Sequence, residues 1–147
     1  MVMIKVLIVD DILEVRQELR TVLSLAVNSS RWTADRKHPA DKEHPADISL
    51  PFEIEIVGEA ANGREAICQV EALQPDVILL DLEMPILNGY EAASQIKAHR
   101  PTCRIIALTV HGYEEARQRA LQAGMDDFIV KGAPVEMLVE AILEVKR

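Results

Sequence analysis

Apolar residues fall into two kinds of segment that alternate along the chain. Short, almost continuously apolar runs have the length of strands, and they occupy residues 5–9, 54–58, 76–81, 104–109 and 128–130. The segments between them repeat apolar residues at helical spacing, and they occupy residues 12–26, 63–73, 90–98, 114–123 and 134–142. Strands that alternate with helices predict an α/β fold, in which helices cover both faces of a parallel sheet.

The polar residues best suited to ligand binding or catalysis lie at the ends of the predicted strands. In open parallel sheets, ligands bind beyond the carboxyl ends of the strands, where the strand order reverses. The residues that close the strands here are Asp10, Asp11, Asp81, Thr109 and Lys131. We therefore expect these side chains to form one site, although they are far apart in the sequence.

One segment interrupts the alternation. Residues 27–53 separate the first helix from the second strand, which is far longer than the usual connection. The segment contains two near-repeats of six residues across 36–47, and its Pro, Ser and charge content predicts an irregular surface insertion within one domain, 1–147. The alternative is a metal site made by the repeated His38 and His44 with the aspartates of the same repeats.

Length and composition are those of one globular domain. The chain has 147 residues, of which 49% are hydrophobic and only 3% aromatic, so we expect an aliphatic core. The net charge of −8 disfavours direct contact with nucleic acid, because that affinity comes largely from Lys and Arg. Any part of the protein that contacts DNA is therefore expected outside these residues.

The sequence also lacks the signals of a membrane or secreted protein. No apolar run approaches the roughly 18 residues that span a bilayer. Asp10 and Asp11 directly follow the apolar start of the chain, which favours a buried strand over a signal peptide. Cys68 and Cys103 lack metal-type spacing, and we interpret them as reduced thiols of a cytoplasmic protein.

Three carboxylates at one edge of a sheet need a compensating charge. Two unit charges about 4 Å apart repel by roughly 4 kcal/mol at an effective dielectric near 20. Carboxylate oxygens without neighbouring Cys or His favour a hard cation, and Mg²⁺ is the expected one. A simpler alternative is that Asp10 and Asp11 only cap the helix that follows them. The metal-site interpretation depends on the other three residues reaching the same edge.

Lys131 and Thr109 extend this chemistry to phosphate. A carboxylate, a divalent cation, a lysine and a hydroxyl make up a phosphoryl-transfer site, where positioning and charge neutralisation do most of the catalysis. The sequence has no Gly-rich loop that would hold a nucleotide. Because no Ser, Cys or His nucleophile closes a strand, the expected acceptor is a carboxylate, which would form an acyl phosphate.

Four stretches resemble the receiver domains of bacterial response regulators in two-component systems. They are residues 9–11, 81–89, 107–109 and 130–131, in the order and at the strand ends typical of the family. The resemblance covers nearly the whole chain apart from the insertion. It implies a doubly wound, five-stranded parallel sheet of order 2-1-3-4-5, the flavodoxin-like or CheY-like fold. It also implies a switch rather than an enzyme, one that catalyses only its own phosphorylation and slow dephosphorylation.

The resemblance assigns a role to each residue of the expected site. Asp81 would be the phosphoacceptor, and Thr109 and Lys131 would bind the phosphoryl oxygens. Lys131 would pair with Asp81 before phosphorylation. The implied ligands of Mg²⁺ are Asp11 and Asp81 directly, Asp10 mainly through water, and the backbone carbonyl of Glu83.

Three positions bear on switching and on rate. In the family, the residue matching Thr109 moves toward the phosphoryl group and an aromatic residue matching Phe128 swings inward behind it. The family often has Tyr there, so Phe128 would act through packing alone, and the alternative is that it is simply a core residue. Val110 replaces a smaller Ala, and Glu83 puts a carboxylate beside the acceptor. We expect both to affect the lifetime of phospho-Asp81.

The expected partner is a sensor histidine kinase or phosphotransfer protein, and homodimerisation is expected on phosphorylation. Residues 57–63 and 131–132 are similar to those of regulators with a LuxR-type DNA-binding domain, such as the NarL type. This favours a transcriptional output through a domain beyond Arg147. The alternative is a stand-alone regulator that acts by protein contact.

Two other classes of protein share part of the pattern. Phosphatases of the haloacid dehalogenase type also place an Asp after an apolar strand, but they need a second Asp two residues on, where this chain has Glu83. A degenerate receiver that serves only as a binding module is the other alternative. The complete set of acids together with Thr109 and Lys131 argues against it.

Overall fold

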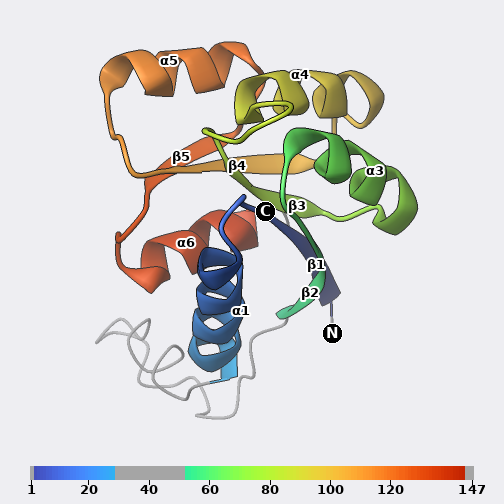
Figure 1. Cartoon of the computed structure of the whole chain (residues 1–147). Coiled ribbons are helices and arrows are strands. Elements are labelled where there is room, and N and C mark those ends of the chain that lie inside the picture. Colours follow the sequence, from blue (N-terminus) through green and yellow to red (C-terminus); the bar gives the residue numbers. More distant parts are fainter. Residues whose placement is uncertain (1, 29–51, 145–147) are drawn as a thin grey trace.

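The computed structural model describes residues 2–28 and 52–144, and it has a five-stranded parallel sheet at its centre (Figure 1). The strands are β1 (Val2–Val9), β2 (Phe52–Ala60), β3 (Val77–Asp81), β4 (Arg104–Thr109) and β5 (Asp127–Val130). Their order is β2-β1-β3-β4-β5, which confirms the predicted doubly wound sheet. The order reverses between β1 and β3, so the crevice expected to bind a ligand lies at the carboxyl ends of these two strands.

Helices cover both faces of the sheet. They are α1 (Leu13–Asn28), α3 (Gly63–Leu73), α4 (Gly89–His99), α5 (Glu114–Gln122) and α6 (Val135–Leu143). Figure 1 shows α1 and α6 on one face of the sheet and α3, α4 and α5 on the other. Each predicted helix is therefore present, with ends that differ from the prediction by a few residues at most.

The core is aliphatic and divided by the sheet into two layers. Along β3, Val77 and Leu79 pack toward α1 and α6, whereas Ile78 and Leu80 pack toward α3, α4 and α5. All five residues of β3 are buried, which explains its uninterrupted apolar sequence. Burial on both faces fixes the strand in place and holds Asp81, its last residue, at the carboxyl edge.

The expected insertion is only partly within the described residues. Helix α1 continues to Asn28 and strand β2 begins at Phe52, so the ends of the predicted insertion belong to regular elements. Residues 29–51 lie outside the described part of the chain, and with them the repeats and the alternative metal site of His38 and His44. The connection leaves and rejoins the fold at α1 and at the edge strand β2.

Candidate functional site

Three acidic side chains meet at the carboxyl edge of the sheet. Asp10 follows β1 and Asp81 ends β3, and these strands are neighbours, with Val9 paired to Leu80. Carboxylate oxygens of Asp10, Asp11 and Asp81 all lie within 4.8 Å of one another. Asp10 and Asp81 are buried, with exposed fractions of 1% and 5%, whereas Asp11 is exposed. The sequence-based expectation that these residues converge is met by this geometry.

Both carboxylate oxygens of Asp10 are already engaged. Oδ1 accepts a hydrogen bond of 2.9 Å from the backbone N–H of Ile12, and Oδ2 accepts one of 2.7 Å from Nζ of Lys131. The bond to Ile12 is a cap-like contact, so the helix-capping alternative accounts for one oxygen of Asp10 and not for the cluster. Asp11 and Asp81 are therefore the acids better placed to bind a metal directly, with Asp10 behind them.

Lys131 lies between the two buried acids. Its Nζ is 2.7 Å from Asp10 Oδ2 and 3.4 Å from Asp81 Oδ1. The expected pairing with Asp81 is thus present, but the nearer partner is Asp10. Burial lowers the pKa of Lys131, yet the hydrogen bond to Asp10 and the charge of Asp81 outweigh it, and the net pKa is raised. The lysine is fully charged at neutral pH and partly neutralises the cluster.

Asp81 is the acid whose ionisation is most strongly opposed. Burial raises the pKa of its carboxyl to about 6, and the negative charge of Asp10 acts in the same direction. The charge of Lys131 and the backbone N–H of Glu83, 3.4 Å from Oδ1, act against this rise. A cation beside Asp81 would remove the repulsion and favour the ionised carboxylate. The oxygen donors of the cluster suit a hard ion such as Mg²⁺.

The remaining predicted residues also lie at this edge. Thr109 ends β4, is 2% exposed, and its Oγ1 accepts a hydrogen bond of 3.1 Å from the backbone N–H of His111. The backbone N–H of Lys131 donates to the carbonyl of Thr109 at 2.7 Å, which ties the ends of β4 and β5 together. Thr109 and Lys131 therefore sit on adjacent strand ends, on the β4–β5 side of Asp81.

The loop after Asp81 is held close to the acid by a glycine. The backbone N–H of Gly89 donates to the carbonyl of Leu82 at 3.1 Å. A Cβ atom at Gly89 would collide with the carbonyl oxygen of Asp81, so only glycine lets α4 begin this close to the acceptor. Asn88 caps the same helix through its side chain, which accepts from the N–H of Glu91. The Asn88-Gly89 pair thus fixes the loop that presents Glu83.

Glu83 and Val110 lie on the loops that border the site. Val110 is 61% exposed, and the side chain of Glu83 is 67% exposed. Glu83 Oε1 is 3.8 Å from Nε2 of His111, so the loops after β3 and β4 face each other there. Phe128, by contrast, is half-buried and packs against the core layer beneath α3, α4 and α5. That packing fits both the switch and the core interpretation.

Sequence reasoning missed two residues behind the acids. Arg16 of α1 donates from Nη1 to the backbone carbonyl of Asp10, at 2.6 Å, and from Nε to Glu59 of β2, at 3.0 Å. A signal existed for Glu59, because it is an acid near the carboxyl end of a half-buried strand, at the same edge as Asp10. Its partner could not be found without the relative position of α1 and β2.

Comparison with known proteins agrees with this geometry. The sequence model of the response regulator receiver domain matches residues 48–143. The response regulator protein VraR of Staphylococcus aureus is 39% identical over 93 residues, which are 63% of this chain and 44% of VraR. The chain thus matches less than half the length of this curated relative.

Solved structures agree over nearly the whole chain. The receiver domain of NarL from Mycobacterium tuberculosis, described as a putative response regulator, superposes with a TM-score of 0.76 at 25% identity, over 99% of this chain and 98% of that one. The response regulator domain of Thermotoga maritima CheB gives 0.71 at 29% identity, over 97% and 96%.

Among the described residues, no helix combines the length and the apolar character needed to cross a bilayer.

The family match spans most of the chain, from residue 48 to residue 143, and the fold and the strand-end acids agree with it. The chain belongs to the response regulator receiver domain family.

Proposed function

We propose that Asp81 accepts a phosphoryl group in a Mg²⁺-dependent reaction and that the domain works as a phosphorylation switch. One observation carries the proposal: the oxygens of Asp10, Asp11 and Asp81 lie within 4.8 Å of one another, and the ammonium of Lys131 is 3.4 Å from Asp81. Such a cluster brings a nucleophilic carboxylate, a cation site and a fixed positive charge into contact. These are the parts that phosphoryl transfer requires.

Each residue has a distinct task in the proposed reaction. A carboxylate oxygen of Asp81 attacks phosphorus, and as this O–P bond forms, the bond to the donor breaks and its electrons leave with the donor. Lys131 and Thr109 bind the phosphoryl oxygens and neutralise their charge. Asp11 and Asp81 would hold Mg²⁺ directly, Asp10 through water, with the backbone carbonyl of Glu83 completing the set. When bound, Mg²⁺ supplies charge neutralisation between the carboxylates and the phosphoryl group.

The donor we propose is the phosphohistidine of a sensor kinase or phosphotransfer protein, with small acyl phosphates as substitutes. The domain would catalyse only its own phosphorylation and slow dephosphorylation, in the cytoplasm. Movement of Thr109 toward the phosphoryl group, with repacking of the half-buried Phe128, would transmit the signal. Homodimerisation is a further expected consequence of phosphorylation.

The output that we propose is control of transcription, through a DNA-binding domain outside this chain. Support comes from the similarity of residues 57–63 and 131–132 to regulators with a LuxR-type domain. The second candidate is a stand-alone regulator that acts by protein contact. Reading the gene beyond Arg147 separates the two.

The test is intact-mass measurement after incubation with Mg²⁺ and acetyl phosphate. One added phosphoryl group is expected on the parent chain and on Asp127→Asn. This control changes an acid at the amino end of β5, whereas the proposed site lies at the carboxyl ends of the strands. No addition is expected on Asp81→Asn or when Mg²⁺ is chelated. Mg²⁺ alone should also raise the melting temperature, because it binds only the folded cluster. A parent chain that gains no mass would make this domain a binding module instead.

A further inference from the structure

The backbone of Asp10 is held at both of its peptide groups, the one before it and the one that leads into Asp11. The N–H of Asp10 donates to the carbonyl of Ala60 at 3.0 Å, which continues the pairing of β1 with β2. The carbonyl of Asp10 accepts from Nη1 of Arg16 at 2.6 Å. The side chain of Arg16 is only 14% exposed, so this charge-assisted hydrogen bond is shielded from water. The contact reaches the backbone of the metal site without touching its carboxylates.

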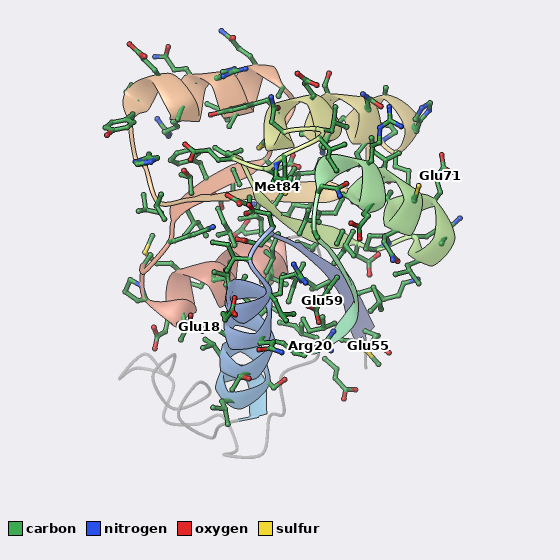
Figure 2. The ribbon with its side chains drawn as sticks, viewed as in Figure 1. Glu18, Arg20, Glu55, Glu59, Glu71 and Met84 are labelled. Atoms are coloured by element: carbon green, nitrogen blue, oxygen red, sulfur yellow. The ribbon has the colours of Figure 1, made fainter. Side chains whose placement is uncertain are left out.

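Arg16 is itself fixed by Glu59. Oε1 of Glu59 accepts from Nε of Arg16 at 3.0 Å, and Oε2 accepts from Nε and Nη2 of Arg20 at 3.0 and 2.9 Å. Burial raises the pKa of the Glu59 carboxyl, but the hydrogen bonds and charges of the two arginines outweigh it and the net pKa is lowered. Figure 2 labels Arg20 and Glu59 between α1 and β2. Glu59 is therefore ionised at neutral pH and orients Arg16.

The two bonds of Arg16 need a guanidinium group. Nε donates to the carboxylate of Glu59, and Nη1 of the same rigid plane donates to the carbonyl of Asp10. A lysine has a single nitrogen and cannot reproduce this fork in a fixed plane. Because the Asp10 carbonyl belongs to the peptide that leads into Asp11, fixing its direction restricts where the exposed Asp11 carboxylate can point. Repulsion among the three acids would otherwise favour turning Asp11 outward.

We propose that Arg16 is a positioning residue of the metal site, which holds the Asp10–Asp11 peptide in the orientation that binds Mg²⁺, and that Glu59 keeps Arg16 in place. The inference rests on the proposed function, since Mg²⁺ is the ligand. It gives Arg16 of α1 and Glu59 of β2 a role in Mg²⁺ affinity, although neither residue is a ligand of the metal. Residues that hydrogen-bond to metal-binding residues typically lower metal affinity by about ten- to a hundredfold when they are replaced.

The test measures Mg²⁺ affinity by titration calorimetry and the melting temperature in chelator, using the full chain. Arg16→Lys should weaken Mg²⁺ binding about tenfold. The matched control is Arg104→Lys, because Arg104 also bridges a backbone carbonyl (Ala141, 2.9 Å) and a carboxylate (Asp127, 3.5 Å), at the amino end of β4. This control should lower the melting temperature and leave the Mg²⁺ affinity unchanged. A purely structural role for Arg16 would give the same result as the control.

Each outcome decides between the proposals. A parent chain that binds Mg²⁺ while Arg16→Lys binds it equally well overturns the positioning role and leaves the proposed function intact. A parent chain that binds no Mg²⁺ overturns both. If Arg16→Lys does not fold, Glu59→Gln replaces it: weaker Mg²⁺ binding than in the parent supports the role, and unchanged binding overturns it.

Discussion

The ammonium group of Lys131 donates a 2.7 Å hydrogen bond to Asp10, and Asp81, at 3.4 Å, is its more distant partner. The lysine therefore compensates a fully buried acid that lies behind the proposed acceptor. This arrangement leaves Asp81 with only part of a positive charge, which agrees with the raised pKa of its carboxyl. The metal-free cluster is thus left with excess negative charge around Asp81, and several measurable consequences come from that excess.

Removal of the Asp81 charge should stabilise the metal-free protein. The folded-state pKa of Asp81 is raised from 3.8 to about 6, so ionisation of this group costs the folded state stability as pH rises through that window. At pH 7 we expect Asp81→Asn to increase the free energy of unfolding by about 1 to 3 kcal/mol. At pH 4 most of the gain should be lost, because the carboxyl is then protonated in the folded state and partly protonated in the unfolded state. Urea unfolding in chelator at pH 7 and pH 4 measures this, and an equal gain at both pH values would contradict it.

Loss of the Lys131 charge should destabilise the metal-free protein. Lys131→Met leaves the buried Asp10 without its cation, and we expect the free energy of unfolding to fall by about 2 to 4 kcal/mol at pH 7 without Mg²⁺. Added Mg²⁺ should restore more stability to this variant than to the parent. Lys97→Met is the control, because Lys97 pairs with Asp126 at 2.7 Å outside the acid cluster. Equal responses of both variants to Mg²⁺ would show that Lys131 does not share the site with the metal.

The charge of Glu83 should slow phosphorylation by an anionic donor. Its side chain is 67% exposed on the loop after Asp81, so it repels an approaching acetyl phosphate. Glu83→Gln should raise the phosphorylation rate about two- to fivefold at low salt, with less effect at high salt because exposed charges are screened. Glu71→Gln, on α3 (Figure 2), is the control and should leave the rate unchanged. A salt-independent rate increase would point to a cause other than charge.

The size of Val110 should affect how long the phosphoryl group lasts. Val110 directly follows Thr109 and is 61% exposed, and we expect its methyl groups to restrict the access of water to Asp81. Val110→Ala should speed hydrolysis of phospho-Asp81 about two- to fivefold, because a smaller residue excludes less water. The decay of the phosphorylated mass after removal of the donor gives the rate. Lifetimes that are equal in Val110→Ala, in Glu83→Gln and in the parent would refute the role of both positions.

One substitution in the loop after Asp81 should stabilise the protein. Ile86 has a φ of +71° and is 74% exposed, so a β-branched side chain occupies the left-handed region with little burial in return. Ile86→Asn should raise the free energy of unfolding by about 1 kcal/mol, because Asn tolerates this backbone conformation. Thermal unfolding measures the change. A lower melting temperature would mean that Ile86 contributes packing that outweighs its strain.

Much of the fold and the site could be predicted because it depends on local patterns. The uninterrupted apolar sequence of β3 indicated a strand buried on both faces, and all five of its residues are buried. The parallel order of strands then placed Asp10, Asp81 and Lys131 at one edge. The family match begins only at residue 48, so Asp10 and Asp11 lie outside it, and their place in the site was predicted from strand periodicity and the short motif 9–11.

The sequence by itself determined which elements form, in which order, and which residues end the strands, because backbone geometry imposes periods that can be read directly along the chain. Tertiary structure alone decided that Lys131 is nearer to Asp10 than to Asp81, that Arg16 holds the Asp10 carbonyl, and that the Asp81 carboxyl is hard to ionise. Those facts depend on distances of a few ångströms between side chains brought together by packing, as for Asp10 and Lys131, which are 121 positions apart. No pattern along the chain encodes such distances.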